Sequence, residues 1–232
     1  MTSTDTRDGF DAVVLGAGEA GTIVAGLAVE SGLSVALVFR EPWGSTCLNL
    51  GCVPSKFLIH RARVAHLTRT AGRFGVQAGD PTVDLRAIVE EKRATVDGHR
   101  AVSWNGALSA SGLELLEGEA RFVSHRQVRV GERILEADRI FIATGMRPLI
   151  PPVPGLEDRP FLTNEGVMEL DTVPEHLIVI GGGYIGCELG QVFRRFGSQV
   201  TIVQRGDRLI GEEDQDASTV LGRAFTDEAS TC

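Results

Sequence analysis

Residues 10–21 read FDAVVLGAGEAG, an apolar run that leads directly into three glycines at the spacing GxGxxG. The β-branched run Phe10–Leu15 predicts a buried strand, and the apolar periodicity after Gly21 predicts a helix that ends near Gly32. A second apolar run, Ser34–Phe39, predicts another strand. Strand, glycine turn, helix and strand in this order are typical of a dinucleotide-binding βαβ unit.

Each glycine of this first fingerprint has an expected task. Gly16 makes the tight turn, Gly18 lets the backbone approach a pyrophosphate, and Gly21 lets the helix pack closely on the strand. The phosphates would then lie at the helix N-terminus. An ordinary glycine-rich turn is the alternative. The acidic residue expected at the end of the second strand, to bind the ribose hydroxyls, is replaced by Phe39, and Glu41 is the nearest candidate to substitute for it.

A second fingerprint follows the apolar run Leu177–Ile180. The residues expected to hold its nucleotide are Gly181, Gly183, Tyr184, Ile185 and Gly186. A helix and the strand Gln199–Val203 complete the unit. Two fingerprints in one chain predict two dinucleotides, and a redox step between them is the simplest explanation.

The residues after this last strand bear on nucleotide choice. Gln204 and Arg205 stand where an acidic residue would favour the free 2′-hydroxyl of NAD. Arg205 and Arg208 instead favour the 2′-phosphate of NADP. The cofactor expected here is therefore NADP, with NAD as the alternative. The interpretation without a function is that these residues form an exposed polar loop.

Two cysteines lie in the sequence CLNLGCVPSK, residues 47–56. In a regular helix, Cys47 and Cys52 would be separated by about 7.5 Å of rise. A disulfide needs Cα atoms roughly 4.4–6.8 Å apart, so pairing requires a tight curl, which Gly51 permits. Pro54 favours a helix start that places Cys52 at a helix N-terminus. Spacing alone leaves a strained redox disulfide and a pair of reduced loop thiols equally open.

Composition excludes several classes of function. The 232 residues carry 23 basic and 31 acidic side chains, a net charge of −8, which argues against binding to nucleic acid or an anionic membrane. No secretory leader and no apolar run of about 18 residues is visible, so we expect a cytoplasmic protein. Four cysteines do not make a disulfide scaffold, and without a second cysteine pair or a histidine cluster no metal site is expected.

The region between the two fingerprints predicts helices first and then short strands. Helices are expected from Pro54 and over Asp84–Val102, and an antiparallel meander over residues 113–137, followed by the strand Asp138–Ala143. A proline-rich connector after Pro148 suggests a boundary between a first domain, residues 1–150, and a second, residues 151–232.

Five segments together resemble the class I flavoprotein (pyridine nucleotide-) disulfide oxidoreductases, the family that includes glutathione reductase, dihydrolipoamide dehydrogenase and mercuric reductase. They are GAGEAG, GSTCLNLGCVPSK, GEARF, IFIATGMRP and GGGYIGCEL, and they span nearly the whole chain. Departures from the family pattern are Ser45 and Phe39. The resemblance implies an α/β fold: a Rossmann-like FAD-binding domain with an antiparallel meander, plus an incomplete second Rossmann-like domain for NAD(P).

The resemblance also implies roles for individual residues. Cys52 would be the sulfur facing the flavin and Cys47 the interchange sulfur facing the substrate. Lys56 would approach the flavin and pair with Glu188, and Tyr184 would cover the flavin until the nicotinamide displaces it. FAD would be held by Gly16, Gly18, Gly21, Glu41, Thr46, Lys56, Ala120, Thr144 and Gly145.

The implied activity passes hydride from NAD(P)H through FAD to the disulfide Cys47–Cys52. The final acceptor would be a small-molecule disulfide or a thiol-bound metal. In the reverse direction, a dithiol substrate would be oxidised and NAD would accept the hydride. Family members are about twice this length, so the chain corresponds to the N-terminal part of a homodimeric enzyme, with the C-terminal FAD segment and interface domain absent. Mercury chemistry in the family uses further C-terminal cysteines, of which the chain offers Cys232. A non-catalytic dinucleotide-binding fragment is the alternative.

Overall fold

Strand β1 (Thr6–Leu15) lies inside a six-stranded sheet of the order β3-β2-β1-β6-β5-β4. The structure is a computed structural model that describes residues 6–230, with side chains for residues 8–228. It has two units. The first contains the described residues up to Val53 together with Thr95–Pro151, and the second contains Pro54–Ala94 and the described residues from Pro152 onward.

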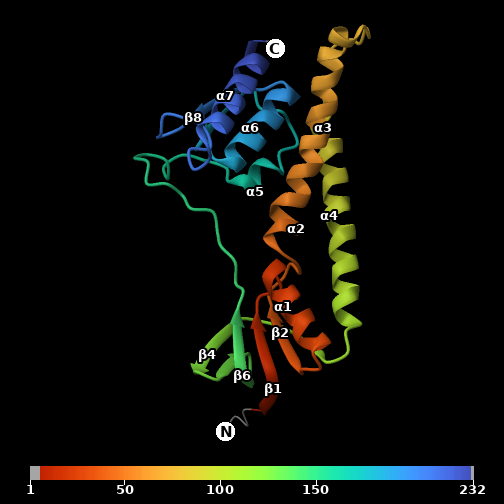
Figure 1. The fold of residues 1–232 in the computed structure, drawn as a ribbon, viewed down its shortest axis with the longest axis vertical. Helices are drawn as coiled ribbons and strands as arrows, with labels where there is room; N and C mark the ends of the chain where they lie inside the picture. Colours follow the sequence, from red (N-terminus) through yellow and green to blue (C-terminus); the bar gives the residue numbers. More distant parts are fainter. Residues whose placement is uncertain (1–5, 231–232) are drawn as a thin grey trace. The chain divides into compact units, whose positions relative to one another are not determined.

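The parallel half of the sheet confirms the βαβ unit predicted from the first fingerprint. β1 pairs in parallel with β2 (Val35–Phe39), and helix α1 (Glu19–Glu30) connects them. All five residues of β2 are buried, as expected for a strand covered on both faces. Figure 1 shows β1, β2 and β6 side by side, with α1 next to them.

One predicted strand takes a different place. Residues Leu113–Leu116 were expected in the antiparallel meander, but β3 (Leu113–Glu117) pairs in parallel with β2 and extends the Rossmann sheet. Its backbone follows helix α4 (Leu85–Leu108), so the connection is a crossover rather than a hairpin. A short apolar strand carries no periodicity that distinguishes these two settings.

A single long strand, β6 (Arg133–Ile142), replaces the two strands expected over residues 133–143. It pairs in parallel with β1 and in antiparallel fashion with β5 (Gln127–Val130). β4 (Ala120–Ser124) completes the predicted meander beside β5. The Rossmann sheet and the meander are thus one continuous sheet, joined at β6.

Two apolar clusters hold the first unit together on the two faces of the sheet. One is centred on Val14, Val35 and Leu37 under α1, and the other on Val13 and Leu135. At the end of β2 the rings of Phe39, Trp43 and Trp104 pack edge to face, with centroids 5.1–5.6 Å apart. Trp104 is therefore a packing residue.

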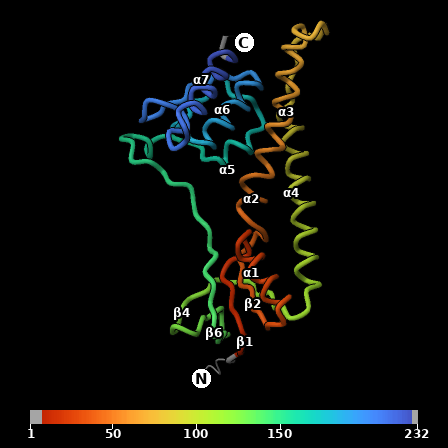
Figure 2. Tube along the Cα trace, in the orientation of Figure 1, coloured from red at the N-terminus to blue at the C-terminus, as the bar shows by residue number. Residues whose placement is uncertain are grey.

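The second unit contains the second predicted fingerprint. Strands β7 (His176–Ile180) and β8 (Gln199–Val203) are parallel and are joined by α6 (Tyr184–Phe196). Helix α7 (Gln215–Ser230) follows β8, and α5 (Asn164–Val167) precedes β7. Figure 2 shows α6 and α7 next to each other within this unit.

Two long helices, α3 (Cys52–Thr70) and α4, each contribute residues to both units. α3 follows the short helix α2 (Thr46–Leu50) and is followed by one 3₁₀ turn (Ala71–Phe74), and α4 begins after Asp84, whose carboxylate caps Ala87 N at 3.0 Å. Within the second unit their parts form one core with α6, made by Leu58, Ala62, Leu85, Val89, Leu189, Val192, Phe193 and Phe196. None of the helices in residues 6–230 is long and apolar enough to cross a membrane.

Candidate dinucleotide and cysteine site

The first glycine turn fits only residues without a side chain. Gly16 has φ +109°, and a Cβ there would lie 2.3 Å from Ala143 O. A Cβ on Gly21 would lie 1.8 Å from Gly16 O. Atoms this close cannot coexist, so both positions require glycine, in agreement with the tasks predicted for the turn.

Helix α1 begins at this turn with its first amides open to a ligand. Its N-cap is Gly18, which provides no side-chain cap. The position that a Cβ would occupy on Gly18 is 4.0 Å from both Ala143 O and Ser45 Cα. Uncapped amides at a helix N-terminus bind anions, and this cradle therefore fits the pyrophosphate of a dinucleotide.

The cysteine segment adjoins the same cradle and curls as its sequence predicts. Ser45 caps α2 by accepting a hydrogen bond from Leu48 N at 3.0 Å. A Cβ on Gly51 would approach Thr46 O to 2.9 Å and Cys47 Cα to 3.2 Å, so this glycine permits the turn that returns the chain to Cys47. Cys52 then begins α3, at a helix N-terminus as expected.

Cys47 and Cys52 are brought into direct contact as reduced thiols, not as a disulfide. A side-chain hydrogen bond with Cys52 raises the pKa of the Cys47 thiol, and partial burial and the charge of a Cys52 thiolate act in the same direction. The backbone N–H of Cys52 opposes this change, and the carboxylate of Glu19, in the first turn of α1, adds a small further increase. The pair is thus arranged for reversible thiol–disulfide chemistry, with the glycine turn beside it.

Other predicted FAD residues lie at the ends of the strands. Thr144 and Gly145 follow β6 and are exposed, as is Thr46 at the start of α2. Ala120 begins β4, two residues after Gly118, whose N–H donates to Phe39 O at 2.8 Å. These positions remain predictions as cofactor contacts.

Phe39 occupies the position at which an acidic residue would bind the ribose hydroxyls. Its side chain is buried in the aromatic cluster and does not take that role. The carboxylate of Glu41 lies two residues further on and accepts a hydrogen bond from Trp43 N at 3.2 Å. Its side chain is exposed, and its role toward a ribose stays a prediction.

The second glycine turn repeats the geometry of the first. Gly181 has φ +110°, and a Cβ on Gly186 would lie 2.1 Å from Gly181 O. Gly183 is the N-cap of α6 and offers no side-chain cap, and the first turn holds no acidic residue. Ile185 is exposed in that turn. This cradle also fits a dinucleotide phosphate.

Contacts from the β8–α7 connection reach this turn, including two that the sequence did not indicate. The predicted residue Gln204 accepts a hydrogen bond from Gly182 N at 2.9 Å. Ile210 N donates to Gly182 O at 2.7 Å, and a Cβ on Gly182 would lie 2.6 Å from Leu209 Cδ2. The backbone contact of Ile210 and the packing of Leu209 depend on loop conformation, which periodicity does not report.

The two arginines predicted to select NADP lie on the same connection. Arg205 is exposed. The guanidinium of Arg208 donates to Gly211 O at 2.8 Å, so part of its donor set serves the loop itself. Of the two, Arg205 is the better candidate for a 2′-phosphate.

Lys56 and Glu188 form the ion pair that the resemblance implied. Lys56 Nζ lies 2.6 Å from Glu188 Oε1 and 2.7 Å from Glu188 Oε2. Both side chains belong to the second unit and are substantially exposed, at 58% and 41%. An exposed pair of this kind adds little stability, so a functional reason for it is more convincing.

Tyr184 is the first residue of α6 and is 58% exposed, so it is not a packing residue. Its hydroxyl donates a hydrogen bond to the carboxylate of Glu213, and this bond raises the pKa of the phenol. Glu213 lies in the acidic stretch EEDQD, residues 212–216. Nothing in its spacing pointed to Tyr184.

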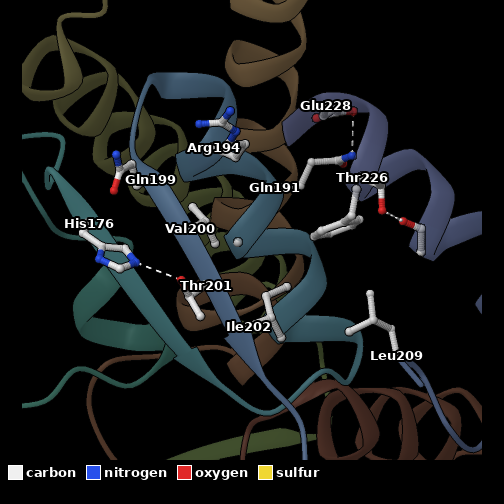
Figure 3. Close-up of a pocket in the computed structure, with 13 residues that line it drawn as sticks. His176, Gln191, Arg194, Gln199, Val200, Thr201, Ile202, Leu209, Thr226 and Glu228 are labelled. Carbon is white, nitrogen blue, oxygen red and sulfur yellow. Dashed lines mark hydrogen bonds between the residues drawn. The ribbon is translucent and has the colours of Figure 1, made fainter. Parts of the chain in front are cut away.

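A cavity of about 630 Å³ lies within the second unit, and none of the predicted nucleotide residues lines it. Figure 3 shows residues of β8 and α6 lining it, with Glu228 of α7 beside Gln191. The ring of His176 is hydrogen-bonded to the Thr201 hydroxyl at 2.9 Å. The described residues contain no group of three or more histidines, cysteines and carboxylates that could hold a metal ion, and Cys232 lies outside them.

The site thus combines two glycine turns that fit dinucleotide phosphates with a pair of contacting cysteines. The family profile for pyridine nucleotide-disulphide oxidoreductase matches residues 10–229. The chain belongs to this family.

Similar proteins agree with this assignment. Mercuric reductase of Acidithiobacillus ferrooxidans is 40% identical over 233 residues, and that of Lysinibacillus sphaericus is 37% identical over 222 residues. These alignments cover 97% and 96% of the chain. Among solved structures, the HOCl-induced flavoprotein disulfide reductase RclA from Escherichia coli matches with a TM-score of 0.80 and 29% identity over 94% of the chain.

The chain is short beside all three proteins. It spans 42% and 41% of the two mercuric reductases and 47% of the RclA chain. The matched part contains both glycine turns and the cysteine pair.

Proposed function

We propose that this chain is the N-terminal part of an FAD-dependent NAD(P)H:disulfide oxidoreductase. Residues 1–150 would form the FAD-binding domain and residues 151–232 the NAD(P)-binding domain. The observation that carries the proposal is the contact between two thiols, Cys47 and Cys52, directly beside a glycine turn that fits a dinucleotide.

In this proposal the residues of the chain bind and orient the nucleotides, and the two cysteine sulfurs exchange electrons. FAD, when bound, would relay the electron pair of a nicotinamide hydride to the Cys47–Cys52 disulfide. Gly16, Gly18 and Gly21 would bind its pyrophosphate at the start of α1. Lys56, held by Glu188, would place a positive charge beside the flavin ring.

Thiol exchange then follows from the reduced pair. The Cys47 thiolate attacks one sulfur of a substrate disulfide, which forms a mixed disulfide and releases the first substrate thiol. Cys52 attacks the Cys47 sulfur, which releases the second thiol and restores the Cys47–Cys52 disulfide. The raised pKa of Cys47 makes this thiolate scarce at neutral pH, so a nearby base would accelerate the first step.

The finer assignments rest on chemistry and on the relatives. NADP is favoured over NAD by Arg205, and an acidic group to repel a 2′-phosphate is absent from residues 204 and 205. The names of the relatives, mercuric reductase and HOCl-induced flavoprotein disulfide reductase, favour a thiol-bound metal ion or a small disulfide as substrate. We expect a homodimeric, cytoplasmic parent enzyme.

The test counts thiols in the 232-residue chain. After mild oxidation, wild type should lose two alkylatable cysteines, while Cys52→Ser should lose none. With FAD bound, one equivalent of NADPH should restore both thiols in wild type. Cys187→Ser is the matched control, because Cys187 is a buried thiol outside the cysteine segment, and it should behave as wild type.

A second candidate, a non-catalytic dinucleotide-binding chain, predicts a different result. FAD and NADPH would then bind, but oxidation would not link Cys47 to Cys52. Failure to bind either nucleotide would contradict both candidates.

A further inference from the structure

The connection between β8 and α7, residues 204–214, lies against the second glycine turn. Gly182 is contacted in three ways: its N–H donates to the side chain of Gln204, its carbonyl accepts from Ile210 N, and Leu209 packs against its Cα. The connection is therefore part of the nucleotide cradle rather than a free loop.

The conformation of this connection is fixed from its other side. Ser218 Oγ donates to Leu209 O at 2.7 Å, and Glu213 N donates to Ile210 O at 2.9 Å. Ile210 has φ +43°, a left-handed conformation that a β-branched residue adopts only when its surroundings impose it. These contacts place Glu213 at a defined position.

At that position the carboxylate of Glu213 accepts the hydroxyl proton of Tyr184 in a hydrogen bond. Tyr184 is the first residue of α6 and directly follows its N-cap, Gly183. A negative charge is thus held beside the helix end at which the phosphates of a nucleotide would bind. Glu212 adds a second negative charge next to it.

We propose that Glu213 is a positioning residue that holds Tyr184 in place and opposes pyridine nucleotide binding until the hydrogen bond opens. The inference rests on the proposed function, since it concerns the nucleotide site of the second unit. Two effects act together: the bond must break before the ring can move, and the carboxylate repels the incoming phosphates. Nucleotide affinity is accordingly weaker than the cradle alone would give.

Tyr184 provides a direct readout, because it is the sole tyrosine in the chain. Its ionisation can be followed by absorbance near 295 nm without any nucleotide. In Glu213→Gln the phenolate no longer faces a carboxylate, so the titration midpoint should fall toward that of free tyrosine. Glu212→Gln removes the same charge one residue away and should move the midpoint much less.

Calorimetry with NADP⁺ and NAD⁺ tests the consequence for binding. Glu213→Gln should bind both about twofold to fivefold more tightly than wild type, the range expected for an exposed charged contact. Tyr184→Phe keeps the charge but removes the bond, and should also bind more tightly. In the Tyr184→Phe background the effect of Glu213→Gln should shrink, because the two residues act on one contact.

The outcomes separate this inference from the proposed function. If wild type binds nucleotide and Glu213→Gln matches Glu212→Gln in both titration and affinity, the positioning role is wrong and the proposed function stands. Equal effects of Glu213→Gln with and without Tyr184 would show charge repulsion alone and also overturn the positioning role. If wild type binds neither nucleotide, both ideas fail.

Discussion

Gly21→Ala is the substitution whose effect can be worked out most directly from the structure. The new Cβ would lie 1.8 Å from Gly16 O and 3.0 Å from Gly16 C. Both are backbone atoms of the turn, so no flexible side chain can yield. To restore an ordinary contact, α1 must move about 1.5 Å further from the end of β1. Overpacking of this kind costs about 1–3 kcal/mol.

The same helix supplies a matched control. Gly26 lies in the interior of α1, and a Cβ there meets no atom within 4 Å. Gly26→Ala should therefore stabilise the first unit by about 0.5–1 kcal/mol, because alanine is the better helix former. The two variants add the same methyl group to the same helix and should differ by about 1.5–4 kcal/mol in free energy of unfolding.

Tryptophan fluorescence during urea unfolding is the appropriate assay. Trp43 and Trp104 are the two tryptophans of the chain, and both lie in the first unit. Binding of added FAD provides a second measurement, because displacement of α1 moves the amides that would meet its pyrophosphate. Equal unfolding midpoints and equal FAD binding for the two variants would refute the close-approach argument for Gly21.

Three further predictions concern charge and protonation. Arg205→Glu should shift the ratio of NADP⁺ to NAD⁺ affinity toward NAD⁺ by about tenfold or more in calorimetry, and an unchanged ratio would remove Arg205 from nucleotide selection. Cys52→Ala should lower the pKa of Cys47. Alkylation of Cys47 by iodoacetamide, measured by mass spectrometry, should then reach half its maximal rate at a lower pH than in wild type. An unchanged pH profile of alkylation would contradict the hydrogen bond between the two cysteines. Burial raises the pKa of Glu169, but hydrogen bonds from Lys92 and Arg93 outweigh it and leave the pKa below its ordinary value of 4.5. The stability this contributes is present above that value and declines as the pH falls through the folded pKa, so Glu169→Gln should flatten this part of the acid unfolding profile.

Removing Glu169 and removing Lys92 should have unequal effects on stability. Lys92 is 1% exposed and contacts Met168 O and Glu169, whereas Glu169 is also bound by Arg93. Glu169→Gln leaves a buried ammonium group without its carboxylate, and Lys92→Met does not. Glu169→Gln should therefore destabilise the second unit more, by about 1–3 kcal/mol in chemical unfolding. The reverse order would show that packing of the lysine chain, not its charge, dominates.

The sequence predicted the parts of the fold that repeat a local pattern. Both glycine turns, the helices that follow them and the curl at Gly51 depend on residues close together in the chain, where spacing and glycine conformation are informative. The placement of β3 and the continuity of β6 depend on which distant strands pair. Short apolar runs do not record that choice, and both expectations were wrong.

The candidate site shows the same division. Cys47, Cys52 and the glycines were found from spacing. Spacing alone left the pairing of Cys47 with Cys52 open, because the direction of the loop depends on Gly51 and on the cap at Ser45 acting together, and only the resemblance implied the disulfide. Glu213 was missed, since its approach to Tyr184 is set by the loop conformation around Ile210 and not by any repeat in the sequence.

Strand β6 also determines when the first unit can form during synthesis. β1 is placed between β2, which emerges soon after it, and β6, which is separated from it by more than half of the chain. Until residues 133–142 have left the ribosome, one edge of β1 has no partner, and the apolar residues of the meander have no sheet to join. The nascent chain therefore carries an open β-edge until these residues emerge, which predicts slow acquisition of protease resistance and dependence on chaperones that bind extended apolar segments.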